Sequence, residues 1–225
     1  MSPVNIIETA KAMQLDIIAI TDHNSTLHCA LTQQLGKRAG VFVVGGAEVT
    51  SREEVHCLAL FASDESLTEF QQFLEDHLPY VPNNPDYFGD QVVIDEHEVI
   101  IEQVPTLLIS ALTASLADIE AKVKELNGLF IPAHVDRPSY SLISQLGFIP
   151  ESLQADALEI HRKTVPAQFR DQYRVDPNLA LIKSSDAHML KDIGRGYTSF
   201  QMEEASFAEI GKALAGIAGR KVMAA

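Results

Sequence analysis

The sequence predicts an α/β fold in which short apolar strands alternate with amphipathic helices. The first predicted strand, 17–20, reads Ile-Ile-Ala-Ile and runs directly into Thr21, Asp22 and His23. A short β-branched apolar segment that ends at polar residues is typical of a strand buried in a parallel sheet. Its carboxyl end presents an acid and an imidazole, at the edge where α/β folds, barrels included, place their sites. These observations favour a barrel-like architecture with a site at the strand ends.

The elements follow one another with clear start and stop signals. A helix is predicted over 2–13, because Ser2 is a favourable N-cap and Pro3 suits the first helical position. Glycines that follow a periodic pattern close two later helices, at Gly40 and Gly128. The later helices are predicted over 26–39, 66–78, 115–127, 166–173 and 205–217, with a helix or loop over 139–154. The later strands are predicted over 41–44, 55–61, 129–135, 157–160 and 179–185, with a last strand after 194–200.

Two neighbouring strands, 41–44 and 55–61, are separated by only a few residues. A parallel crossover needs roughly a dozen residues or more, so these strands should pair as an antiparallel hairpin. This pairing would bring Glu48, which follows the first strand, close to His56 at the start of the second. The segment 79–106 is the least regular, and we expect it to be an excursion that contains a small hairpin.

Composition limits the class of protein. A chain of 225 residues with 46% hydrophobic residues is long enough for one domain with a substantial core, predicted here over 1–225. No apolar segment reaches membrane-spanning length and no basic-then-apolar leader is present, so we expect a cytoplasmic protein without a membrane partner. Cys29 and Cys57 define no disulfide framework. The net charge of −14 argues against long nucleic acid as a partner, but a bound metal would still allow a small anionic substrate.

Histidines and carboxylates gather at the predicted strand edges. Four of the eight histidines lie there, each near a carboxylate: His23, His56, His134 and His188. Imidazole and carboxylate groups that converge from separate strands are typical ligands of divalent transition metals. Such ions lower the pKa of a bound water and neutralise charge during hydrolysis. His28, His77 and His97 are expected at the surface, and Asn24 is expected to cap the next helix.

Three arginines follow predicted strand ends and are candidates for binding phosphate. Forked guanidinium groups bind phosphate oxygens in pairs. Arg137 and Arg195 are the stronger candidates and Arg162 is the third, whereas a surface salt bridge remains the alternative for each.

Four motifs resemble those of the PHP family, which is named for its polymerase-associated and histidinol-phosphatase members. They are ITDHN, the Glu48–His56 pair in GAEVTSREEVH, PAH at 132–134 and SDAH at 185–188, in the family's order over about 3–217. The resemblance implies a distorted seven-stranded (β/α)7 TIM-like barrel with two or three metal ions that usually hydrolyses phosphate esters.

The resemblance also implies roles for individual residues. It implies metal ligands at these positions: His23, Glu48, His56, His134, Asp186 and His188. Glu48 would bridge ions, and Asp22 would orient a neighbouring imidazole or bind metal itself. Asp22, Asp186 and His188 are the catalytic candidates, with a metal-bound hydroxide as nucleophile. One to three ions of Mn, Fe or Zn are expected.

One departure from the family's pattern is important. The family opens with a strand that contains a His-x-His pair, followed by another histidine, and this sequence contains neither. We therefore expect a barrel without its first strand, fewer metal ligands, and an open edge prone to homo-oligomer formation. A truncated product and a genuine variant both remain open.

The predicted function is metal-dependent hydrolysis of phosphate esters, with a small phosphorylated metabolite or a nucleotide as substrate. A metal hydrolase that cleaves C–N or C–O bonds could use the same ligands. Without the His-x-His strand, a metal-poor remnant or a binding module is the alternative that is not an enzyme.

Overall fold

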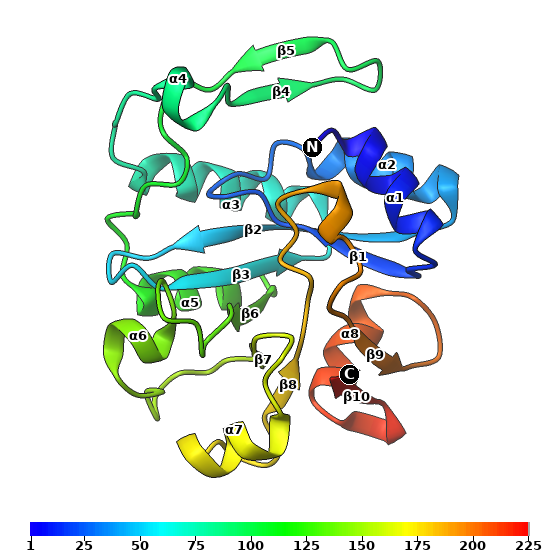
Figure 1. Ribbon diagram of the computed structural model, residues 1–225, viewed down its shortest axis with the longest axis vertical. Helices are drawn as coiled ribbons and strands as arrows, with labels where there is room; N and C mark the ends of the chain where they lie inside the picture. The colour runs from blue at the N-terminus through cyan, green and yellow to red at the C-terminus, as the bar shows by residue number, and fades with distance from the viewer. Residues whose placement is uncertain (225) are drawn as a thin grey trace.

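The computed structural model describes residues 1–224 as a mixed α/β structure (Figure 1). Its helices are α1 (Pro3–Ala12), α2 (Cys29–Ala39), α3 (Asp64–His77), α4 (Pro85–Phe88), α5 (Leu116–Glu125), α6 (Leu142–Leu146), α7 (Pro166–Tyr173) and α8 (Phe207–Leu214). Its strands are β1 (Ile17–Ile20), β2 (Phe42–Thr50), β3 (His56–Phe61), β4 (Val92–Ile94), β5 (Ile100–Gln103), β6 (Leu129–Pro132), β7 (Ala157–Glu159), β8 (Ala180–Ile182), β9 (Thr198–Gln201) and β10 (Lys221–Ala224). Two short 3₁₀ helices are η1 (Leu190–Asp192) and η2 (Ile217–Gly219).

The central sheet has the strand order β1-β2-β3-β6. β1 and β2 are parallel, whereas β3 is antiparallel to both β2 and β6. The predicted hairpin is therefore confirmed, and its register pairs Thr50 with His56. An isolated parallel bridge between His23 and Glu48 continues the β1–β2 pairing beyond the end of β1. The central sheet thus places three of the predicted ligands at one edge.

The strands do not close into a barrel within residues 1–224. β7 and β8 form a parallel pair and β9 and β10 an antiparallel pair, and β7 lies beside β6 while β10 lies beside β8. Between β6 and β7 the backbone forms single bonds, from Asp156 to Phe130 and from Val135 to Glu159, instead of a regular ladder. The Asp156 carboxylate also accepts a hydrogen bond from the Phe130 backbone N–H. The result is a mixed α/β fold rather than the expected seven-stranded barrel.

Both faces of the central sheet are covered, as the alternation of β3 illustrates. Cys57 and Phe61 belong to one apolar cluster, which includes residues of α3 and α5. Leu60 belongs to a second cluster, which includes residues of β8 and α8. Because successive side chains of a strand point to opposite faces, a strand between two clusters must be apolar throughout. This burial fixes the register that brings the site residues together.

The structure corrects the expectation that the first strand is fully buried. Ile20 is buried, but Ala19 is exposed and the other residues of β1 are partly exposed. The reason is position, because β1 is the outer strand of the central sheet. The N-terminal helix is confirmed, with the Ser2 hydroxyl accepting a hydrogen bond from the Asn5 backbone N–H. β10 is an element that the sequence did not predict.

The segment 79–106 contains the predicted hairpin, β4–β5, which stands apart from the central sheet at the top of Figure 1. Val93 is its buried apolar residue, whereas every residue of β5 is exposed. The hairpin is linked to α2 by an Arg38–Glu96 ion pair of 2.5 Å. In the region that the structure describes, no helix is long and apolar enough to cross a membrane.

Candidate metal centre

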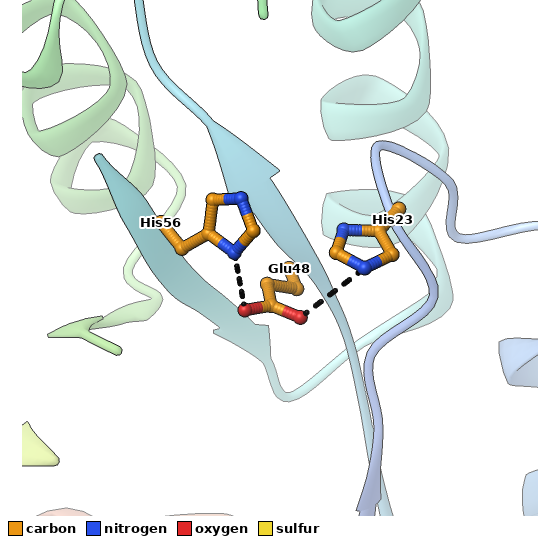
Figure 2. Close-up of side chains that lie close together, drawn as sticks. All are labelled: His23, Glu48 and His56. Carbon is orange, nitrogen blue, oxygen red and sulfur yellow. Dashed lines mark hydrogen bonds and ion pairs between the residues drawn. The ribbon is translucent and has the colours of Figure 1, made fainter. Parts of the chain in front are cut away.

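Glu48 lies at the middle of a cluster of imidazoles at the edge of the central sheet (Figure 2). Its Oε1 atom lies 2.9 Å from Nδ1 of His56 and 3.2 Å from Nε2 of His134. Its Oε2 atom lies 3.7 Å from Nε2 of His23. We call these four residues the His–Glu cluster. Its members come from β2, from the start of β3, and from the segments that follow β1 and β6.

A fourth histidine extends this arrangement. The ring centroids of His188 and His23 are 5.9 Å apart, those of His23 and His56 are 5.4 Å apart, and those of His56 and His134 are 5.2 Å apart. The four histidines singled out in the sequence therefore form one continuous row. His188 is at the exposed end, with 64% of its side chain accessible, whereas the His134 side chain is 6% accessible.

The electrostatics of the cluster favour the protonation states that bind cations. Burial raises the pKa of the Glu48 carboxyl, but hydrogen bonds from His134 and His56 outweigh it, so the pKa lies below its ordinary value. Burial also lowers the pKa of His23, against the attraction of Glu48. An ionised carboxylate beside a neutral imidazole is the form in which these side chains bind metal ions.

Two buried nitrogen atoms of the cluster have no hydrogen-bond partner. They are the Nδ1 atoms of His23 and His134. Buried polar atoms without a partner are uncommon and call for an explanation. His23, Glu48 and His56 also offer one donor atom each within 4.8 Å of one another, a spacing suited to one ion. The donor set of nitrogen and carboxylate oxygen therefore fits a divalent transition metal.

Asp186 joins the cluster to its surroundings. One carboxylate oxygen lies 3.7 Å from Nδ1 of His188, and the other forms an ion pair of 2.5 Å with the Arg137 guanidinium. Asp186 and His134 both have positive φ angles, of 46° and 31°, which non-glycine residues rarely adopt. Such strain occurs most often at functional sites.

Asp22 lies at the edge of this region and has a different partner from the one expected. Its carboxylate contacts Nδ1 of His28 at 3.2 Å, and Nε2 of His28 accepts a hydrogen bond from the Ile94 backbone. One tautomer satisfies both contacts, with the proton on Nδ1. The expectation that His28 is a surface residue is wrong, because the hairpin packs over it and leaves 18% of its side chain accessible.

A cavity of about 260 Å³ adjoins the cluster. Its lining includes all three arginines predicted to bind phosphate, Arg137, Arg162 and Arg195, together with His134 and Asp186. We call it the arginine cavity. Two of these guanidinium groups already have partners, since Arg137 pairs with Asp186 and Arg195 pairs with Asp192 at 2.7 Å. The structure thus brings the three predicted arginines together around one cavity.

Comparisons with known proteins support the same family. A family model described as PHP-associated matches residues 177–216. The uncharacterized protein YqxK of Bacillus subtilis is 36% identical over 114 residues, which make up 48% of this chain and 29% of that protein. Residues 177–216 are therefore similar to the PHP-associated family.

Solved structures agree with this fold. The lesion-specific endonuclease EndoQ from Pyrococcus furiosus matches with a TM-score of 0.69 and 20% identity, over 98% of this chain and 52% of that one. A two-domain protein from Bacteroides vulgatus, described as containing a predicted PHP-like metal-dependent phosphoesterase, matches with a TM-score of 0.55 and 15% identity, over 98% and 59%. This chain therefore spans about half the length of the endonuclease, and its match to YqxK spans less than a third of that relative.

Two residues of the candidate site were missed in the sequence. Glu159 of β7 lines the arginine cavity and accepts hydrogen bonds from the His134 backbone at 3.0 Å and from the Ser184 hydroxyl. Burial raises the pKa of this carboxyl. A single acid in the apolar strand 157–160 was the available signal. Tyr140, which stacks on His56, gave no signal of this kind.

Proposed function

We propose that this PHP-like chain hydrolyses phosphate esters with the help of divalent transition metal ions bound at the His–Glu cluster. One observation supports this most directly: His134 belongs both to the cluster and to the lining of the arginine cavity. A metal at the cluster and an anion in the cavity would therefore be neighbours. That is the arrangement that hydrolysis of a phosphate ester requires.

The residues have distinct roles in this proposal. His23, Glu48, His56 and His134 would hold the first ion, and Asp186 with His188 would supply further ligands at the open end of the row. The bound ions would activate a water molecule and offset the charge of the reacting phosphate. Asp22, paired with His28, would fix the backbone beside His23.

Arg137, Arg162 and Arg195 would orient the phosphate group. Arg137 is paired with Asp186, so binding of a metal at Asp186 would free its guanidinium for the substrate. Arg162 is exposed and lines the same cavity. Two guanidinium groups that reach one phosphate fix its orientation as well as its charge.

We favour a small phosphorylated substrate. The net charge of −14 opposes the binding of long nucleic acid, which depends on extensive contacts between cations and phosphates. EndoQ is described as a lesion-specific endonuclease, and its likeness to this chain concerns the fold. A phosphate diester therefore belongs in the experimental test, as the second type of ester.

We also propose that the central sheet is one wall of an open barrel. Within the described residues, β1 pairs only with β2, so its outer edge is available to another strand. An added strand with a His-x-His pair would supply further ligands there. Fusing such a segment before Ser2 should raise the metal stoichiometry, and unchanged stoichiometry would contradict this proposal.

The function is tested by assaying the chain with added Mn, Fe or Zn on three chromogenic substrates: a phosphate monoester, a phosphate diester and an amide. We expect the monoester to be hydrolysed fastest. Arg137→Lys should weaken binding of inorganic phosphate by about tenfold while metal content is unchanged, because lysine cannot form the paired contact. Arg52→Lys, at an exposed position outside the cavity, is the matched control.

Two results would contradict the proposal. Hydrolysis of the amide but of neither ester would favour a hydrolase acting on C–N bonds. Failure to bind any of the three metals, with no change in melting temperature, would favour a binding module.

A further inference from the structure

Tyr140 lies beside His56 of the His–Glu cluster and is held there at two points. Its carbonyl oxygen accepts a hydrogen bond of 3.0 Å from the His56 backbone N–H. Its ring stacks on the His56 imidazole, with centroids 5.0 Å apart and an angle of 25° between the planes. The position of Tyr140 is therefore set by a residue that we expect to bind metal.

The ring remains accessible although one face packs on His56. Tyr140 is 47% exposed, whereas the next two residues, Ser141 and Leu142, are completely buried. Large aromatic side chains with this much exposed surface often take part in binding. An aromatic ring fixed on one face and open elsewhere is a ready stacking surface.

The backbone at Tyr140 is strained. Its φ angle is 54°, in the left-handed region that bulky residues avoid. The residues around it hold this conformation, because the Ser141 hydroxyl donates a 2.7 Å hydrogen bond to the Arg137 carbonyl oxygen and also caps α6. Strain that the surroundings maintain indicates that the position of the side chain matters.

The same segment carries Arg137, whose guanidinium lies beside Asp186 in the arginine cavity. Arg137 and Tyr140 are only three residues apart and reach different members of the site. Tyr140 lies outside the lining of the cavity, three residues along the chain from Arg137. The organic part of an ester whose phosphate is held near Arg137 would extend along this segment toward Tyr140.

We propose that Tyr140 stacks against a planar group of the substrate, so that the preferred substrates are phosphate esters of aromatic or nucleobase-containing alcohols. This inference rests on the proposed phosphoesterase function and adds the chemical class of the substrate. A fixed tyrosine loses little conformational freedom on binding, and ring-on-ring stacking tolerates many planar groups. A role limited to supporting His56 is the competing explanation.

Two substrates separate these explanations: benzyl phosphate and cyclohexylmethyl phosphate. Both are esters of primary alcohols of similar size, but only the first has a planar ring. Tyr140→Leu should lower kcat/KM for benzyl phosphate about tenfold, mainly through KM, the size expected for loss of one stacking contact. The loss for cyclohexylmethyl phosphate should stay below about threefold, and Tyr140→Phe should leave both within about twofold. Tyr87→Leu, at a highly exposed position on α4, is the control.

The outcomes distinguish the proposed role of Tyr140 from the proposed phosphoesterase function. An equal loss for both substrates, with or without loss of metal, would assign Tyr140 to support of His56 and overturn the inference, as would no loss at all. Metal-loaded wild-type protein that hydrolyses neither ester and binds no inorganic phosphate would overturn the phosphoesterase proposal, and the substrate class with it. Titration with benzylphosphonate and cyclohexylmethylphosphonate, which cannot be hydrolysed, should show the same preference in binding alone.

Discussion

The His–Glu cluster and the arginine cavity meet at His134 but hold their charged groups in different ways. Glu48 and its imidazoles are fixed by strands of the central sheet, and only 9% of the Glu48 and His56 side chains is accessible. In the cavity, Arg137 lies on a connecting segment, is 41% accessible, and is paired with Asp186. The proposed metal-binding end is therefore already organised, whereas the proposed phosphate-binding end would have to exchange an internal ion pair for an external anion.

The largest effect, a loss of metal affinity, is expected at Glu48. Glu48→Ala removes the carboxylate that contacts three imidazoles, so metal affinity should fall by more than about a hundredfold, beyond the range typical of residues that only support ligands. Metal content by elemental analysis measures this. Glu102→Ala, on the exposed strand β5, should leave metal content unchanged. A Glu48→Ala protein with full metal content would show that the cluster is not the metal-binding end.

An intermediate effect is expected at Glu159, which contacts both regions. Glu159→Ala removes the carboxylate, so the His134 N–H and the Ser184 hydroxyl both lose the acceptor that they donate to. Leaving a buried group unpaired costs about 1–3 kcal/mol, which urea unfolding would detect. Ser184→Ala, which removes only the hydroxyl, should cost less. Equal stability of wild type and Glu159→Ala would mean that the two regions are held independently.

The smallest effect concerns pH in the metal-free protein. Burial holds the pKa of His23 below its ordinary value of 6.5, so near that pH the unfolded chain binds more protons than the folded one. Stability from this residue is therefore present above pH 6.5 and decreases as the pH falls. Between pH 7.5 and 5.5, the melting temperature should fall by roughly 1–3 °C more in wild type than in His23→Gln. Identical pH profiles would contradict the burial argument.

Local sequence signals predicted much of the fold. The N-cap at Ser2, the left-handed Gly40 and the short connection before His56 each depend on neighbouring residues, and each was confirmed. The prediction was wrong where contacts with distant segments determine the position of a side chain. Asn24 was expected to cap a helix, but its side chain donates to the Leu108 and Ser110 carbonyl oxygens instead.

The same distinction applies to the site. Histidines at strand ends were visible as a pattern, because the strands that deliver them could be recognised. Glu159 was missed because a lone acid in a short strand does not reveal which backbone it will contact. Tyr140 was missed because its stacking on His56 depends on how the segment after β6 folds back onto β3. The closure of the barrel was overestimated because single hydrogen bonds between β6 and β7 cannot be read from residue types.

The segment between His134 and Ser141 has consequences for how this protein can diversify. One end is anchored to Glu159 and the other begins α6, while Arg137 and Tyr140 lie between the anchors. If the proposed function holds, mutations between them would alter which ester is accepted without moving a strand of the central sheet. Gene duplicates would then acquire new substrates through a few exchanges in this segment while inheriting the His–Glu cluster unchanged.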